Sequence, residues 1–180
     1  LLQLIDSAQP GDRLDMEVFY LSHRPLVEAL ISARQRGVTI RALLDPNRDA
    51  FGREKNGIPN RQGAWDLHRA GIPLRWCATS GEQCHRKWLR LDRADGSSEL
   101  ISGSANFTRR NLDDLNLETD VQLAANRDHP AMADARSAFE RLWSNADSIT
   151  YSLPYEDFAD HNVGRYLIYR VMEATGLSTF

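Results

Sequence analysis

The chain has 180 residues, of which 42% are hydrophobic and 26% charged, the composition of one globular domain with a sizeable core. Its formal net charge of −3 excludes the general basic field that attracts nucleic acids, although a local basic patch stays open. No run of about 18 apolar residues is present, so we expect no transmembrane segment and favour a cytoplasmic or membrane-associated protein.

The first part of the chain has a strand–helix–strand order. Alternating Leu14, Met16 and Val18 predict a strand within residues 13–21. Residues 23–37 have helical apolar spacing and end in glycine, and the following segment VTIRALLD is typical of a buried strand. Two strands joined by a helix indicate a parallel pair.

The remaining elements follow at shorter intervals. Residues 46–63 are polar and rich in glycine, proline and asparagine, which predicts a long loop. Beyond it we expect a helix at 64–71, strands at 72–77, 84–92, 99–106 and 119–125, and helices at 129–146 and about 163–174. Cys77 and Cys84 bracket a short segment and could form a disulfide, but we expect free thiols because two cysteines are no disulfide framework.

The segment CHRKWLRLD contains the strongest chemical signal. His85 and Lys87 are two residues apart, so on a strand their side chains share a face, and burying both without an anionic partner is unfavourable. Ser104 and Asn106 have the same spacing on the neighbouring predicted strand and would bring a hydroxyl and an amide to this place. Such donors suit phosphate oxygens, while an imidazole can act as nucleophile or general acid. Glu118, the next carboxylate downstream on a strand, could orient the imidazole.

The segments HRKWLRLD and GSANF together resemble the HKD signature of the phospholipase D superfamily. His85, Lys87 and Asp92 match H-x-K-x4-D, and the glycine, serine and asparagine of GSAN match the G-S-x-N that follows it. The likeness covers about residues 10–145, and ARQRGVTIRALLDPN is similar to bacterial cardiolipin synthase-like and phospholipase D-like proteins.

This resemblance implies an α/β fold with a mixed, mostly parallel β-sheet flanked by helices on both faces. We expect residues 1–145 to form a phospholipase D-like catalytic lobe with one HKD motif. Residues 146–180 would form a C-terminal tail whose helix packs on that lobe.

The resemblance also implies cleavage or exchange of phosphodiesters through a phosphohistidine intermediate, without a metal or other cofactor. His85 would be nucleophile or general acid, with the acid role favoured for a second motif. Lys87 and Asn106 would bind phosphate, supported by Ser104. Glu118 would orient His85, and Asp92 would hold the geometry of the motif rather than touch the substrate.

A complete site of this family needs two motifs, and this chain has one. None of the other histidines, which are His23, His68, His129 and His161, is followed by a lysine at the second position. The second motif would come from a missing upstream half or from a homodimer partner. Because the chain starts without methionine, we favour an upstream half and expect a monomer of this chain alone to be inactive.

Three functions remain open. Phospholipid chemistry comes first, as phospholipase D hydrolysis or cardiolipin synthase-type transfer, and a membrane surface is a candidate partner. The tail helix VGRYLIYRVMEATG could suit a membrane interface or pack on the core. A dimeric nuclease is the second reading, because five arginines surround the motif, although carboxylates offset them: Arg86, Arg90, Arg93, Arg109 and Arg110. A non-catalytic scaffold lobe is the third.

Overall fold

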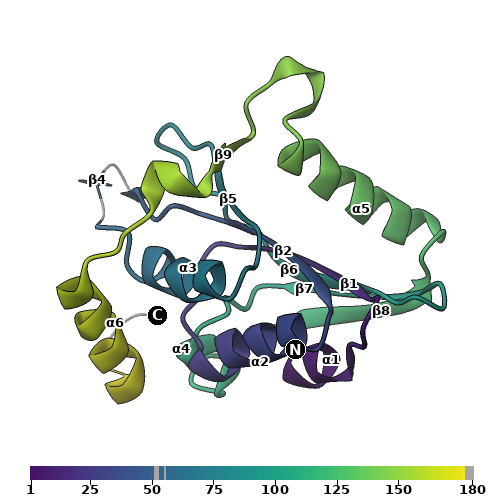
Figure 1. Cartoon of the computed structure of the whole chain (residues 1–180), viewed down its shortest axis with the longest axis horizontal. Helices are drawn as coiled ribbons and strands as arrows, with labels where there is room; N and C mark the ends of the chain where they lie inside the picture. The colour runs from purple at the N-terminus through teal and green to yellow at the C-terminus, as the bar shows by residue number, and fades with distance from the viewer. Residues whose placement is uncertain (51–52, 55, 177–180) are drawn as a thin grey trace.

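A seven-stranded mixed sheet runs through the molecule, with helices on both faces (Figure 1). The computed structural model describes residues 1–50, 53–54 and 56–176. The strand order is β8-β7-β6-β1-β2-β5-β9. These strands are β1 (Arg13–Val18), β2 (Thr39–Leu44), β5 (Leu74–Cys77), β6 (Lys87–Asp92), β7 (Ser97–Gly103), β8 (Asp120–Asn126) and β9 (Ser152–Pro154).

The mixed α/β class predicted from the sequence is confirmed, but the expectation of a mostly parallel sheet is wrong. Within the described chain only the β1–β2 and β2–β5 pairs are parallel, and the other neighbours in the sheet are antiparallel. Each parallel pair is connected through a long helix, of 12 or 10 residues. Short turns connect β6 to β7, and a short helical segment connects β7 to β8, so this half of the sheet runs back and forth.

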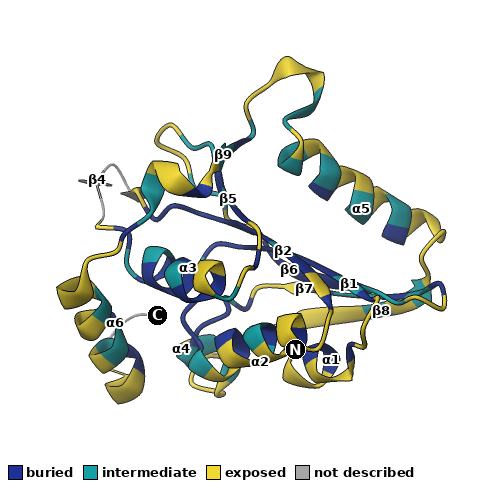
Figure 2. Ribbon diagram, in the orientation of Figure 1, coloured by how far each residue is buried: buried dark blue, intermediate teal, exposed yellow. Residues whose placement is uncertain are grey.

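One face of the sheet is apolar and carries three helices, α1 (Leu2–Ser7), α2 (Arg24–Gln35) and α3 (Asn60–Arg69). Strand β1 contributes Leu14, Met16 and Val18 to this core, as the alternating pattern predicted. Figure 2 shows the buried stripe of α2 turned towards the sheet.

The opposite face is covered by α5 (Pro130–Trp143) and has many buried charges. Asp15 is fully buried and lies 2.7 Å from Arg41 and 3.0 Å from Arg90. Burial raises the pKa of Asp15 to about 6, although Arg13 and Arg90 act in the opposite direction. A small apolar cluster that includes Trp88 and Phe139 completes this interface. The face therefore depends on charge pairing as well as on apolar burial.

The loop predicted at 46–63 is shorter than expected. Helix α3 begins at Asn60, because the Asn60 amide is buried and donates 2.7 Å and 2.8 Å hydrogen bonds to the carbonyls of Phe19 and Asp45. The short strands β3 (Asp49–Ala50) and β4 (Arg53–Glu54) pair within the former loop, part of which lies outside the described residues.

The last segment of the chain contributes an edge strand to the sheet and a helix to the surface. Strand β9 pairs with β5, and the helix predicted at 163–174 is confirmed as α6 (Val163–Thr175). Tyr169 of α6 is buried and donates to the carbonyl of Ser22, 3.3 Å away. Over the residues that the structure describes, no helix has the length and apolar character needed to cross a bilayer.

Candidate active site

His85 and Lys87 lie where the amino end of β6 meets the carboxyl end of β1. Lys87 pairs with Val18 in the register of the two strands, while His85 lies two residues ahead of the regular strand. The backbone pairing continues past the strand ends, since the Phe19 amide donates to the Arg86 carbonyl at 2.9 Å. Lys87 is buried and His85 is exposed, so the imidazole is accessible while the lysine stem is held by the sheet.

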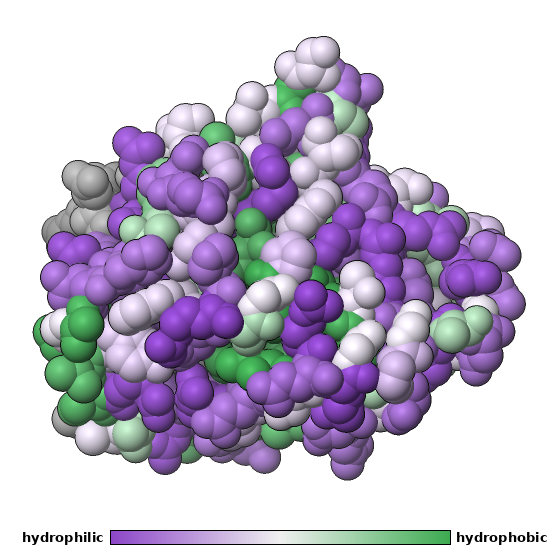
Figure 3. Space-filling model, in the orientation of Figure 1, coloured by the Kyte–Doolittle hydropathy of each residue, from purple (hydrophilic) through white to green (hydrophobic). Residues whose placement is uncertain are grey.

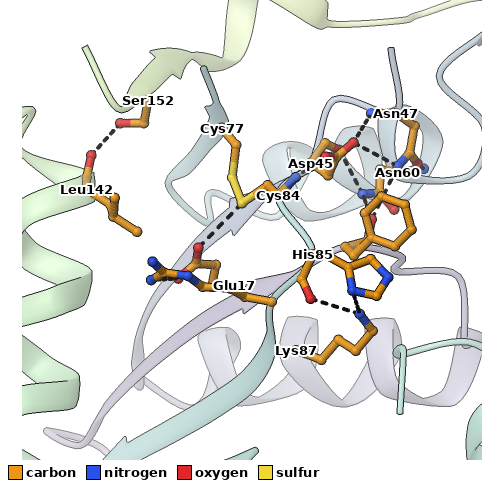
Figure 4. The surroundings of a disulfide bond; sticks show 12 residues. Glu17, Asp45, Asn47, Asn60, Cys77, Cys84, His85, Lys87, Leu142 and Ser152 are labelled. Atoms are coloured by element: carbon orange, nitrogen blue, oxygen red, sulfur yellow. Dashed lines mark hydrogen bonds and ion pairs between the residues drawn. A yellow bond between two sulfur atoms is a disulfide. The ribbon is translucent and has the colours of Figure 1, made fainter. Parts of the chain in front are cut away.

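The two side chains contact each other directly. Lys87 Nζ lies 3.1 Å from His85 Nδ1 and donates to the His85 carbonyl at 2.9 Å (Figure 4). An ammonium group can only donate, so Nδ1 accepts and the proton of a neutral imidazole is placed on Nε2. Burial, and then the Lys87 charge, lower the pKa of His85. The lowered pKa favours the neutral imidazole, which is the form that attacks as a nucleophile.

Phe19 supports this pair from the loop that follows β1. Its ring centroid lies 4.8 Å from that of His85 and 5.4 Å from Lys87 Nζ. The ring limits the orientations of the imidazole and faces the ammonium in a cation–π contact. Sequence reasoning missed Phe19, although an aromatic residue directly after a buried strand at the site's edge is a usable signal.

Ser104 and Asn106 lie beyond β7, which ends at Gly103, so the prediction that they share a strand face is wrong. They lie in the turn after the strand, where the Ser104 amide donates to the Thr119 carbonyl at 3.1 Å. Glycine is required directly before this turn, because a side chain at Gly103 would collide with Asp120 on β8. Asn106 Oδ1 is buried and has no hydrogen-bond partner within the described part of the chain.

Glu118 binds the turn rather than the imidazole. It accepts hydrogen bonds from the Ser104 hydroxyl and from the Asn111 amide. Among the described residues, no hydrogen bond connects it to His85. The Ser104 hydrogen bond is the main cause that lowers the pKa of Glu118. The charge of Glu118 raises the pKa of Lys87 and so opposes the stronger lowering by burial.

Asp92 lies at the far end of β6. It is seven residues beyond His85, which is roughly 23 Å along an extended strand. Its carboxylate accepts from the Ser98 hydroxyl at 2.6 Å and lies 3.2 Å from Arg90 Nη2. These contacts hold the end of β6, and the role of Asp92 in the motif stays a prediction.

A network of side chains behind the site connects its loops. Asn60 accepts from the Leu21 amide at 2.8 Å in addition to its two donated bonds. Asp45 accepts from the amides of Asn47 and Cys84, at 2.7 Å and 2.8 Å. The loops after β1 and β2, the start of α3 and the residue before His85 are thereby held together (Figure 4). The sequence offered no signal for this network.

Cys77 and Cys84 form a disulfide, so the expectation of free thiols is wrong. The bond connects the end of β5 to the residue directly before His85, and Glu17 Oε1 lies 3.4 Å from Cys84 Sγ. Burial raises the pKa of Glu17, which also accepts from Arg86 and Trp88. In the described chain, Glu17 and the two cysteines are the only clustered side chains of metal-binding type, and a disulfide removes the thiolates that a metal would need.

Each of the other four histidines has a structural contact. His23 lies 3.1 Å from Asp113, His68 stacks on Tyr155, His161 lies 3.2 Å from the Tyr155 hydroxyl, and His129 caps α5 by accepting from the Ala131 amide. This chain therefore brings one histidine–lysine pair to the candidate site.

Comparisons with solved structures and with family models agree with the motif, although no curated protein matches the sequence. Among solved structures, Nuc from Salmonella typhimurium, a phospholipase D family member, has a TM-score of 0.55 and 20% identity, with 85% of this chain and 88% of that chain covered. Phosphatidylserine synthase from Haemophilus influenzae has a TM-score of 0.64 and 10% identity, with 97% of this chain but only 41% of that chain covered. NucT from Helicobacter pylori has a TM-score of 0.54 and 16% identity, covering 79% and 84%.

These low identities show a shared fold only. A family model described as "Cardiolipin synthase, PLD-like domain" matches residues 1–143, which is most of the chain. The chain therefore belongs to this family, within the phospholipase D superfamily of phosphodiester-cleaving and phosphoryl-transferring proteins.

Proposed function

We propose that this chain carries one half of a metal-independent site that hydrolyses or transfers phospholipid phosphodiesters through a phosphohistidine. The observation that carries the proposal is the contact between the exposed His85 imidazole and the buried Lys87 ammonium at the edge of the sheet. Asn106 follows the end of the neighbouring strand β7 and so brings a side-chain amide, whose nitrogen can donate to a phosphate oxygen, to the same end of the sheet.

The chemistry starts with the binding of a phosphate. A phosphate oxygen is a stronger acceptor for the Lys87 ammonium than a neutral imidazole, so Lys87 turns from His85 Nδ1 to the phosphate. His85 is then released to act on the diester. As nucleophile it forms a P–N bond while the alcohol leaves, and as general acid it protonates the leaving alcohol while the second histidine forms that bond. Water or a second alcohol then breaks the P–N bond.

The second histidine comes from another motif, in an upstream half or in a second copy of the chain. Asn106 and Lys87 neutralise charge on the phosphoryl oxygens. Ser104, held by Glu118, fixes the turn that carries Asn106. We assign Glu118 this positioning role in place of orienting His85, because its hydrogen bonds go to the turn.

The arginines around the motif favour a lipid over a nucleic acid. Arg90 is buried in the ionic network, with Asp15 and Asp92 as partners. Arg86 and Arg93 each pair with a glutamate, and Arg109 donates to carbonyls at the end of α6. Four of the five arginines that a nuclease would use are therefore engaged within the chain, and little basic surface is left to follow a nucleic-acid backbone.

The test compares two substrates in EDTA, phosphatidylglycerol vesicles and single-stranded DNA. It uses the full-length protein that contains this chain, in its native oligomeric state so that the second motif is present, and its His85→Ala variant. We expect release or transfer of the lipid head group by the protein and none by the variant. Cleavage of DNA alone, lost in the variant, would replace the lipid with a nucleic acid. No turnover of either substrate would favour a scaffold lobe.

A further inference from the structure

Helix α6 turns an apolar surface to the solvent. Val163, Leu167, Ile168 and Val171 are between 53% and 61% exposed. At 100° per residue these four side chains spread over roughly 140° of the helix, and the other residues on this arc are uncharged. Figure 3 shows the corresponding hydrophobic patch at the left edge of the molecule, where α6 lies in Figure 1.

The borders of this arc are basic and its opposite side is packed. Arg165 and Arg170 fall on the two sides of the apolar arc, about 200° and 340° from Val163. Tyr169 and Glu173 point inward and are buried. An apolar face with an arginine on each border is typical of helices that lie in a lipid interface, where guanidinium groups reach phosphates and apolar side chains reach acyl chains.

A second exposed apolar segment lies beside the end of this helix. Leu115 and Leu117, between α4 (Arg109–Leu112) and β8, are 61% and 104% exposed. Arg109 of α4 donates to the carbonyl of Ala174 at 2.6 Å, so α4, which comes directly before this segment, lies next to the last turn of α6. Leu117 directly precedes Glu118, the carboxylate that holds the Ser104 turn.

We propose that α6, together with Leu115 and Leu117, forms a docking surface for a phospholipid bilayer. The proposal rests on the phospholipid substrate class proposed above, and it adds the way in which the site reaches that substrate. Insertion of Leu117 would bring Glu118 and its turn to the depth of the head groups, where the scissile phosphodiester lies. Asp114 is also exposed beside these leucines, so apolar insertion rather than net charge is the main expected driving force.

The shape of the surface argues for a bilayer rather than for a second helix. A helix–helix seam uses a narrow stripe, whereas this arc is wide. Leu117 projects fully into solvent, which suits insertion between lipids better than packing on a flat protein surface. A membrane offers the apolar layer that this arc requires, whereas Arg165 is already paired with Asp160, 3.0 Å away.

The test measures sedimentation of the protein with vesicles of phosphatidylcholine and phosphatidylglycerol. One variant combines Leu117→Gln, Leu167→Gln and Ile168→Gln, and the control is Ile149→Gln, an exposed isoleucine outside this surface. We expect the triple variant to lose about tenfold or more of its vesicle binding and the control to bind like the wild type. Equal binding by wild type and triple variant, or no binding by either, would overturn the proposal.

Two further measurements separate the alternatives. Turnover of a small soluble phosphodiester, bis(p-nitrophenyl) phosphate, should be unchanged by the triple variant, because the site itself is intact. If the wild type is a dimer and the triple variant a monomer, the surface is an interface between copies and the proposal fails. Vesicle binding that is lost in the variant, combined with no lipid turnover by the wild type, would uphold the docking surface and reject the proposed substrate.

Discussion

The two ends of β6 belong to one sequence motif and have different surroundings. At the amino end, His85 and Lys87 contact each other at the edge of the sheet, and the imidazole is open to solvent. At the other end, Asp92 is held by Ser98 and by the buried Arg90. The comparison teaches that a motif spread along a strand cannot converge on one substrate. In the proposed function, one end provides the chemistry, while the other end is held by hydrogen bonds and ion pairs within the sheet.

The largest effect is expected from replacing His85 at the amino end of β6. His85→Ala should lower turnover by about 10⁴-fold or more, because the group that attacks phosphorus or protonates the alcohol is lost. The melting temperature should stay within about 1 °C of wild type, since the side chain is exposed. Steady-state kinetics and thermal unfolding check both statements. A large drop in melting temperature would mean that His85 also has a structural role.

Substitutions near the other end of β6 should lower the stability of the protein and leave its turnover unchanged. Arg90→Leu should lower the free energy of unfolding by about 3–5 kcal/mol, because Asp15 would remain buried without one of its partners. Turnover per folded molecule should be retained. Urea denaturation measures the first quantity, and kinetics corrected for the folded fraction measure the second. Asp92 is a partner of Arg90 that is more exposed than Asp15, and Asp92→Asn keeps the shape of its side chain. This substitution should therefore lower the free energy of unfolding less than Arg90→Leu does.

The disulfide lies next to the amino end of β6, directly before His85, and tests how firmly that end is held. Cys84→Ser should lower the free energy of unfolding by about 2 kcal/mol, because a closed loop of this length no longer restricts the unfolded chain. A reductant should bring the wild type to the stability of the variant and leave the variant unchanged. A wild type that does not respond to the reductant would argue against this bond in solution.

The smallest expected effect is a change in the pKa of His85, which tests the influence of the Lys87 charge on this imidazole. The pKa of His85 is lowered below 6.5 by burial and by Lys87, so its protonation as the pH falls costs stability in the folded state. Lys87→Gln should raise this pKa but leave it below its ordinary value, since burial, the larger cause, remains. NMR titration of the imidazole protons measures the change. If the pKa falls or does not move, the Lys87 charge does not act on His85 as the geometry indicates.

The sequence by itself determined the local parts of this protein. The periodicity of β1 and α2, the helix at the C-terminal end and the identity of His85 and Lys87 all follow from neighbours along the chain. The distance between Asp92 and His85 also follows from the sequence, because the rise of a strand sets it. These features depend on one element at a time, and residue spacing describes one element well.

Only the tertiary structure decided the rest. The antiparallel half of the sheet, the Cys77–Cys84 bond and the place of Ser104 beyond its strand depend on which distant segments meet. The same holds for Glu118, whose hydrogen bonds go to the turn instead of the imidazole. The energy of each of these contacts comes from residues far apart in the chain, so no local pattern encodes it.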